Sequence, residues 1–278
     1  MGRGRWVIIA LGLMLVGLTA FRLSAQIPQN EGGGQMRHDA GQSVTPAFEG
    51  WYPNPDGTFS LSFGYMNRNY KEEPDIPIGP NNKIEPGPAD QGQPTHFQTR
   101  RRHGMFAVIV PKDFGTKQVT WTLTSGGHTY AIPGHLLPDY RLDSLRQTTT
   151  GNTPPVTRLE AEGTPGSGIH GPTTVRTASM SSPLTLDVWA TDDGIRKRGQ
   201  KPTGVGVVWS KYRGAGKVTF SSPESMVDAT GKATTTAKFS QPGEYMVRAH
   251  LYDESGIDAG SDVQCCWTNG YVKITVTP

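Results

Sequence analysis

Apolar and polar residues alternate with a period of two along much of the chain. In "GTFSLSFGY", the side chains of Phe59, Leu61 and Phe63 fall on one face, while serine and glycine occupy the other. This alternation is typical of a half-buried β-strand. The segment 105–111 is more uniformly apolar and predicts a second strand. Beyond residue 25, no stretch shows the periodicity of an amphipathic helix, so the pattern indicates an all-β protein.

The same pattern recurs to the end of the chain. It predicts strands within "KQVTWTLTSGG", "HTYAIPGHLLP", "LTLDVWATDD", "GVGVVWSKYRGAGKVTF", "ATTTAKFSQPGEYMVRAHLYD" and "GYVKITVTP". Short strands separated by Gly- and Pro-rich turns favour antiparallel sandwiches. We therefore expect two immunoglobulin-like antiparallel β-sandwich domains, over residues 48–143 and 183–278. Residues 144–182, rich in Thr, Pro and Gly, are interpreted as a linker with early strands.

The N-terminus has a different character. Arg3 and Arg5 precede an apolar run over residues 6–21, and "LSA" before Gln26 fits a signal-peptide cleavage site. As a helix this run would extend roughly 24 Å, short of the roughly 30 Å hydrocarbon core. We expect residues 1–25 to be either a cleaved signal peptide or a retained anchor in the inner membrane. In both cases the remainder is exported, to the periplasm or the cell surface. Residues 26–47 lack periodicity and are interpreted as a flexible linker.

Charge and cysteine content narrow the classes of function. The chain of 278 residues carries 27 Lys and Arg against 24 Asp and Glu. Residues 1–25 contain Arg3, Arg5 and Arg22 but no Asp or Glu. The rest of the chain therefore has equal numbers of basic and acidic residues and no net charge. A neutral protein has no general attraction to nucleic acid, and we expect membrane contact only through an uncleaved N-terminal segment. The two cysteines, Cys265 and Cys266, are adjacent, which excludes a disulfide-stapled fold.

The second predicted domain resembles the polycystic-kidney-disease-type and related bacterial immunoglobulin-like repeats. The resemblance lies in Trp209 within "VVWSKYRGAG", in "KVTF" and in "FSQPGEYMVRAHLYDESG". Members of that family place a Trp in a central strand, followed by Gly-x-Tyr, alternating apolar residues and an Asp; here these are Gly243, Tyr245, Val247, Ala249, Leu251 and Asp253. The chain departs from the pattern in the insertion "IRKRGQKP" and in the cysteine pair. The resemblance implies a fold but no single function, because such modules serve as spacers or as binders of proteins and glycans.

A long polar passage, residues 67–103, separates two predicted strands of the first domain. Unstructured connections of this length are uncommon in compact domains and are often functional. Six prolines, at positions 74, 77, 80, 86, 88 and 94, lower the entropy lost on ordering. We therefore predict an ordered surface loop that contacts another protein or domain. The candidate contact residues are Tyr70, Ile76, Ile78, Asn81, Asn82, Ile84, Arg100, Arg101 and Arg102.

The three consecutive arginines have two interpretations. They could grip a phosphate or carboxylate. Alternatively, they could pair with the acidic residues of the same loop, Glu72, Glu73, Asp75 and Glu85, and fasten it to the domain.

The pair "CC" before Trp267 is the most unusual local feature. In an oxidising compartment Cys265 and Cys266 could form a vicinal disulfide, which would fix a kink before the last strand. The alternatives are two reduced thiols on opposite strand faces and an intermolecular bridge. A redox enzyme more commonly shows Cys-x-x-Cys beside a helix, and the sequence has no such motif.

No catalytic or cofactor motif emerges. The sequence has no Gly-x-Ser-x-Gly and no zinc-ligand spacing among its histidines, and Ser167 and His170 lie in a Gly/Pro-rich stretch. We predict a non-catalytic protein without cofactor or metal. Its expected role is that of an accessory or adaptor subunit in the cell envelope, with envelope proteins or a membrane complex as partners.

Two other roles remain open from the sequence. One is a carbohydrate-binding module that would bind glycans through exposed Trp51, Tyr52, Tyr65 or Trp189. The other is a metal- or redox-dependent enzyme subunit, which would need the two cysteines beside a cleft or clustered histidines, namely His96, His103, His128 and His135.

Overall fold

The computed structural model describes residues 37–143, 146–147, 150–195, 204–253 and 265–278. The predicted signal or anchor segment, residues 1–25, lies outside these ranges, as does the predicted linker up to residue 36. Within the described ranges the chain is all-β, with two short 3₁₀ turns, η1 (Pro138–Tyr140) and η2 (Gly168–His170). No helix in the described ranges is long and apolar enough to cross a membrane.

Two three-stranded sheets form the first sandwich. One has the order β1-β2-β4 and the other β3-β5-β6, and all of their pairings are antiparallel. Their bounds are β1 Val44–Pro53, β2 Phe59–Asn67, β3 Asn82–Glu85, β4 Arg100–Val110, β5 Val119–Ser125 and β6 His128–Gly134. The alternation in β2 and β5 directs Phe63 and Trp121 into a shared aromatic core with Phe106.

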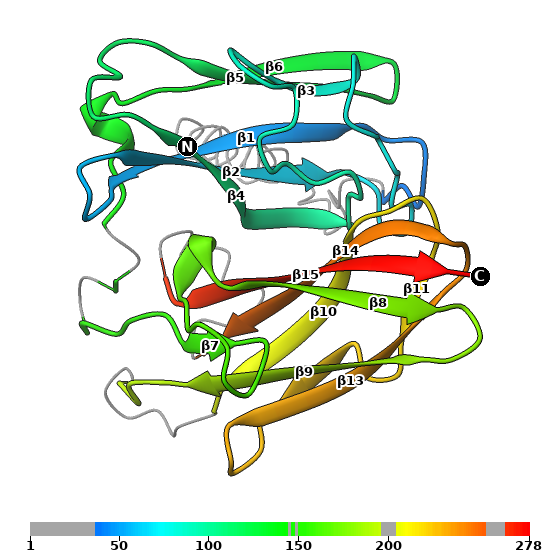
Figure 1. Cartoon of the computed structure of the whole chain (residues 1–278). Coiled ribbons are helices and arrows are strands. Elements are labelled where there is room, and N and C mark those ends of the chain that lie inside the picture. Colours follow the sequence, from blue (N-terminus) through cyan, green and yellow to red (C-terminus); the bar gives the residue numbers. More distant parts are fainter. Residues whose placement is uncertain (1–36, 144–145, 148–149, 196–203, 254–264) are drawn as a thin grey trace, which may run out of the picture. The chain divides into compact units, whose positions relative to one another are not determined.

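The second sandwich has one four-stranded and one five-stranded sheet (Figure 1). The first follows the order β11-β13-β9-β7 and the second β12-β10-β14-β15-β8. Their bounds are β7 Val156–Arg158, β8 Thr173–Ser179, β9 Leu184–Thr191, β10 Gly206–Arg213, β11 Val218–Phe220, β12 Glu224–Met226, β13 Lys232–Phe239, β14 Gly243–Tyr252 and β15 Trp267–Thr277. All pairs are antiparallel except β8 with β15.

This strand order is immunoglobulin-like. Strands β7, β9, β13 and β11 occupy the places of the A, B, E and D strands, and β10, β14 and β15 those of C, F and G. Trp209 lies in β10 with its ring in the core, and Tyr245, Val247, Ala249 and Leu251 of β14 face the same core. The predicted fold class is confirmed, while the narrower polycystic-kidney-disease-type assignment stays a prediction.

The domain boundaries differ from the expected ones. Strand β1 begins at Val44, inside the predicted linker 26–47, because Pro46 and a bulge between Phe48 and Gly50 obscure its alternation. Strands β7 and β8 correspond to the early strands expected within residues 144–182, and both pair with strands of the second sandwich. The second sandwich therefore begins at about Val156 rather than at residue 183. Residues 38–278 form one unit by their internal contacts.

Candidate functional site

The passage 67–103 is a built part of the first sandwich. It contains β3, whose residues Asn82 and Ile84 pair with Leu123 and Trp121 of β5. The buried Asn82 amide donates to the carbonyl oxygens of Ile76 (2.9 Å) and Pro94 (2.8 Å), and its Oδ1 accepts from the Trp121 indole (3.0 Å). One side chain thus joins two distant points of the loop to the core.

The structure separates the predicted contact residues into buried and accessible ones. Ile76, Asn82 and Ile84 are 8%, 0% and 0% exposed, so they cannot contact a partner. They belong to the core and to β3, which is too short to produce a periodic signal. Asn81 is exposed and Ile78 half-buried.

Tyr70 and the three arginines make contacts within the first sandwich. Tyr70 is partly exposed and lies under the Arg100 guanidinium, 4.2 Å from its ring centroid. Arg101 pairs with the buried Glu49 of β1 (2.7 Å), and Arg102 donates to the Thr99 carbonyl (3.1 Å). One interpretation of the sequence had these arginines pairing with the acidic residues of the loop rather than with Glu49 and a main-chain carbonyl.

Of the loop acids that were expected to pair with the arginines, Asp75 contacts the second sandwich, while Glu72, Glu73 and Glu85 make their contacts within the first. Asp75 pairs with Lys211 of β10 (2.9 Å). Asp90, which was not among the predicted contact residues, binds Arg213 through two bonds of 2.8 Å each. These bonds from Arg213 hold the pKa of Asp90 below its ordinary value. A bidentate guanidinium–carboxylate pair also fixes orientation.

Tyr212 is the centre of this contact. Its carbonyl oxygen accepts hydrogen bonds from the Thr95 and His96 amides, each 3.2 Å long. Its hydroxyl donates to the carbonyl oxygens of Gly92 (2.6 Å) and Met105 (3.2 Å). Although Tyr212 belongs to β10, its ring is buried in the core cluster of the first sandwich. We call this contact the sandwich junction: loop residues 90–96 with Gly104 and Met105 on one side, and residues 211–213, 248, 269 and 271 on the other.

A buried cation lies beside Tyr212 in the sandwich junction. Arg248 of β14 is 4% exposed and donates to Asn269 Oδ1 (2.8 Å), and Asn269 in turn donates to the Gly104 carbonyl (2.7 Å). Burial lowers the pKa of Arg248. Gly104 is required here, because a Cβ at this position would lie 2.1 Å from the Trp267 ring. The two sandwiches are therefore joined by buried polar and aromatic contacts rather than by a free linker.

His96 forms a charged cluster at the edge of the sandwich junction. Its Nδ1 lies 2.9 Å from Asp75 and its Nε2 3.1 Å from Glu73. Because both carboxylates accept, both ring nitrogens donate when the ring is protonated. Burial favours the neutral ring, but the two carboxylates outweigh it and raise the pKa of His96. Lys211 also faces Asp75, and Arg102 acts electrostatically on Glu73.

We expect the His96 cluster to stabilise the fold most in mildly acidic solution. A raised folded-state pKa contributes stability below the ordinary pKa of about 6.5, and this is lost as pH rises through the folded value. The pKa values of Glu73 and Asp75 are lowered, so their contribution is lost only in strong acid. His96→Gln should therefore lower the melting temperature more at pH 5.5 than at pH 8.5. Exposed His128→Gln is the control, and equal losses at both pH values would contradict this assignment.

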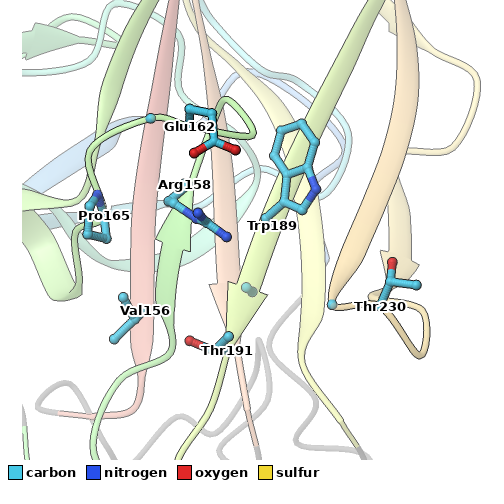
Figure 2. A pocket seen from close by; sticks show the side chains of 10 residues that line it. Val156, Arg158, Glu162, Pro165, Trp189, Thr191 and Thr230 are labelled. Atoms are coloured by element: carbon cyan, nitrogen blue, oxygen red, sulfur yellow. The ribbon is translucent and has the colours of Figure 1, made fainter.

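A pocket of about 350 Å³ lies on the outer face of the β11-β13-β9-β7 sheet (Figure 2). Arg158 of β7 and Lys232 of β13 flank Trp189 of β9 in register. We call this the Trp189 pocket, after the half-buried ring at its wall; its other lining residues are Val156, Arg158, Glu162, Gly163, Pro165, Ala190, Thr191, Thr230 and Gly231. The arrangement offers an aromatic face beside charged and hydroxyl groups.

The four aromatic residues predicted for glycan binding do not form one row. Tyr52 and Tyr65 are 5% and 0% exposed, so neither ring can stack on a sugar. Trp51 is half-buried on β1 of the first sandwich, where its indole donates to the Leu137 carbonyl (2.8 Å). Trp189 belongs to the second sandwich. Of the four aromatic residues, it is the one that lines the Trp189 pocket.

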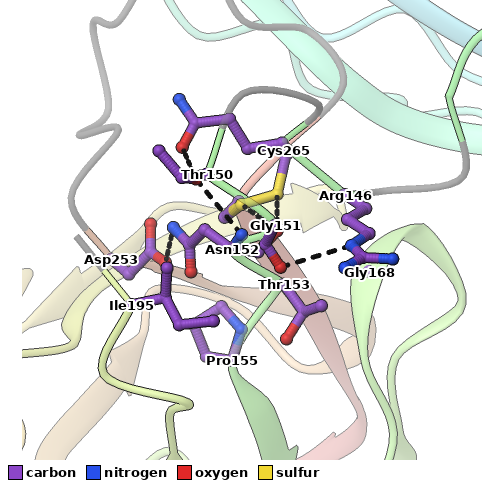
Figure 3. Close-up of a disulfide and its surroundings, with 12 residues drawn as sticks. Arg146, Thr150, Gly151, Asn152, Thr153, Pro155, Gly168, Ile195, Asp253 and Cys265 are labelled. Atoms are coloured by element: carbon purple, nitrogen blue, oxygen red, sulfur yellow. Dashed lines mark hydrogen bonds between the residues drawn. A yellow bond between two sulfur atoms is a disulfide. The ribbon is translucent and has the colours of Figure 1, made fainter. Parts of the chain in front are cut away.

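The cysteine pair is buried at the start of the last strand (Figure 3). Cys265 and Cys266 are joined by a disulfide, and both sulfurs lie 3.5 Å from the Asn152 carbonyl oxygen. The Asn152 amide donates to Asp253 (2.8 Å). The pair therefore contacts, from the segment before β15, the loop that leads into β7, and its burial gives it a packing role in this structure.

The candidate catalytic and metal residues are dispersed. His170 lies 2.7 Å from the buried Ser60 of β2 rather than forming a pair with Ser167. His103 pairs with Glu49 (3.0 Å), whereas His96 lies between Glu73 and Asp75. In the ranges that the structure describes, no group of three or more His, Cys, Asp or Glu residues is placed to hold a metal ion.

Comparison with known proteins adds only distant structural likenesses. No protein-family model and no curated protein matches the chain. Among solved structures, the D00–D0 domains of intimin share 13% identity at a TM-score of 0.28, covering 84% of this chain and 99% of that one. The Yersinia pseudotuberculosis adhesin InvE shares 11% at 0.27, covering 83% and 58%. Domains 4 and 5 of the S-layer protein SbsC share 10% at 0.24, covering 59% and 66%. The fold assignment rests on the strand order above, and these likenesses add nothing to the assignment of a function.

Proposed function

We propose that this chain is an exported, non-catalytic interaction protein of the cell envelope, an accessory or adaptor subunit of a periplasmic or membrane-associated assembly. The sequence supports export through the apolar run over residues 6–21. The sandwich junction is the observation that carries the adaptor role. Two independent sandwiches on a flexible tether would present their surfaces at no fixed distance, whereas this junction holds them as one body.

The physical support for rigidity lies in the kind of contact. Main-chain hydrogen bonds from residues 95 and 96 to Tyr212 fix the loop against β10, and the Asp90–Arg213 pair fixes its orientation. Burial of the Tyr212 ring removes water from the interface, which strengthens these polar contacts. A rigid pair of sandwiches can hold two partners at a set spacing, as an adaptor must.

The proposal is tested with a photo-reactive amino acid placed in the tagged full chain. The sites are exposed apolar positions on each sandwich, Ile109 and Val175, which are 58% and 66% exposed. We expect the chain in the envelope fraction, with position-specific crosslinks to an envelope protein. Tyr212→Ala should reduce crosslinking while leaving export unchanged, because it weakens the sandwich junction that sets the spacing of the two sandwiches. Recovery in the cytoplasm, or crosslinks unaffected by this variant, would refute the adaptor role.

A further inference from the structure

We propose that the Trp189 pocket binds a glycan, with one sugar unit stacked on the Trp189 indole between Arg158 and Glu162. This inference deepens the interaction role proposed above and rests on it. It assigns the ligand class from the chemistry of the pocket.

The indole supplies the stacking surface. A large aromatic side chain on a sheet usually reaches the core, yet Trp189 alternates with the buried Val188 and Ala190 and points outward. Lys232 lies over its ring, with Nζ 5.0 Å from the centroid, and is held there by Asp187 (3.0 Å). Arg158 lies across the sheet on the opposite side of Trp189. Lys232 therefore fixes the orientation of the ring from the β13 side, and Arg158 borders the ring on the β7 side.

The two charged groups of the pocket form no ion pair among the described residues. Arg158 donates one hydrogen bond, to the Ala161 carbonyl (2.9 Å). Glu162 is exposed and likewise forms no ion pair among the described residues. Figure 2 shows both side chains directed toward the space beside Trp189. A guanidinium with free donors and a carboxylate acceptor together match neighbouring sugar hydroxyls, which donate and accept at once.

The charge balance favours a polar neutral ligand. One cation and one anion that form no ion pair among the described residues face the same pocket, so a purely anionic or cationic ligand would meet repulsion from one of them. The hydroxyls of Thr191 and Thr230 extend the hydrogen-bonding wall. The exposed side chain of Val156 adds an apolar contact. An aromatic face with a few placed polar groups is the usual composition of a small-ligand site.

The dimensions fit a chain of sugars. The pocket volume of about 350 Å³ falls in the range of small-ligand sites, roughly 300–1,000 Å³. A second depression of about 480 Å³, bordered by Glu160, Arg176 and Asp187, also includes Trp189 in its wall. Two depressions that share one aromatic ring would accommodate adjoining units of an oligosaccharide.

The test uses the full chain purified from expressing cells. Cellohexaose, chitohexaose and a glycan array are the probes, with binding followed by calorimetry and tryptophan fluorescence. We expect Trp189→Ala to weaken binding roughly tenfold or more, since stacking on an aromatic ring contributes about that factor. Trp189→Phe should retain most of the affinity. Arg158→Gln and Glu162→Gln should each weaken binding roughly tenfold through lost hydrogen bonds to a charged group.

Lys238→Ala is the matched control, because Lys238 is an exposed cation on the same sheet outside the pocket. Melting temperatures of all variants confirm that folding is retained. Absence of binding to every glycan probe overturns the inference, as does binding that Trp189→Ala leaves unchanged. Binding of a peptide at the pocket in place of glycans would also overturn it. Envelope crosslinks at Ile109 and Val175 are scored separately, so the adaptor role can stand if glycan binding fails.

Discussion

Replacing Tyr212 with alanine is expected to lower the free energy of unfolding by about 3–5 kcal/mol and to split one cooperative transition into two. The side chain is 1% exposed and packs against Tyr271, with the ring centroids 5.1 Å apart. It belongs to a strand of the second sandwich but fills the core cluster of the first. Its loss would open a cavity at the point where the two sandwiches share a core.

Differential scanning calorimetry of wild type and variant provides the measurement. Tyr212→Phe is the matched control, because it keeps the ring and removes only the hydroxyl bonds to Gly92 and Met105. Tyr271 also donates to the Met105 carbonyl (2.8 Å), so the Met105 oxygen keeps a hydrogen-bond partner in this variant. We therefore expect Tyr212→Phe to lower the free energy of unfolding by about 1 kcal/mol. A single transition in Tyr212→Ala with a loss below about 1 kcal/mol would show that the sandwiches are not coupled through this ring.

The second large effect is expected at Asn82. Asn82→Ala removes three hydrogen bonds at once and leaves the Trp121 indole and two carbonyl groups without partners. Each buried group left unsatisfied costs about 1–3 kcal/mol, so we expect the three groups together to lower the free energy of unfolding by about 3–9 kcal/mol. Urea unfolding followed by tryptophan fluorescence measures this, because Trp121 is itself one of the partners.

The neighbouring residue provides the control for Asn82. Asn81 has the same side chain but is exposed, and Asn81→Ala should change stability by no more than about 0.5 kcal/mol. Equal effects of the two substitutions would mean that the loop is not anchored through Asn82. A loss confined to the Asn82 variant would show that the passage is an integral part of the first sandwich.

Period-two alternation was enough to predict the long strands. Leu61 and Phe63 of β2 and the apolar face of β14 are buried as the pattern predicted, but β2 is not half-buried, because Ser60 and Ser62 on its other face are buried as well. Strand β1 was missed along its whole length, Val44–Pro53, since Pro46 and the bulge near Gly50 interrupt its alternation. Strand β3 has four residues, too few to show a period.

The candidate sites were less accessible to sequence reasoning, for a different physical reason. The passage 67–103 was correctly singled out as unusual, but its partners on β10 are more than a hundred residues away and carry no local signal. Asp90 and Arg213 each look like an ordinary surface charge until the fold brings them together. Trp189 was among the residues predicted for glycan binding, whereas Arg158 and Glu162 were not. Arg158 comes beside Trp189 only through the pairing of β7 with β9, and Glu162 only through the turn that follows β7.

The position of Tyr212 along the chain has a consequence for the order of folding. Synthesis proceeds from the N-terminus, and the loop residue Gly92 precedes Tyr212 by 120 residues. At roughly 5–20 residues per second, the first sandwich waits roughly 6–24 seconds for the ring that completes its core. During that interval Met105 and the other residues of this core cluster lack the cover that the ring provides. We therefore expect the first sandwich to depend on protection by a chaperone until the chain is complete.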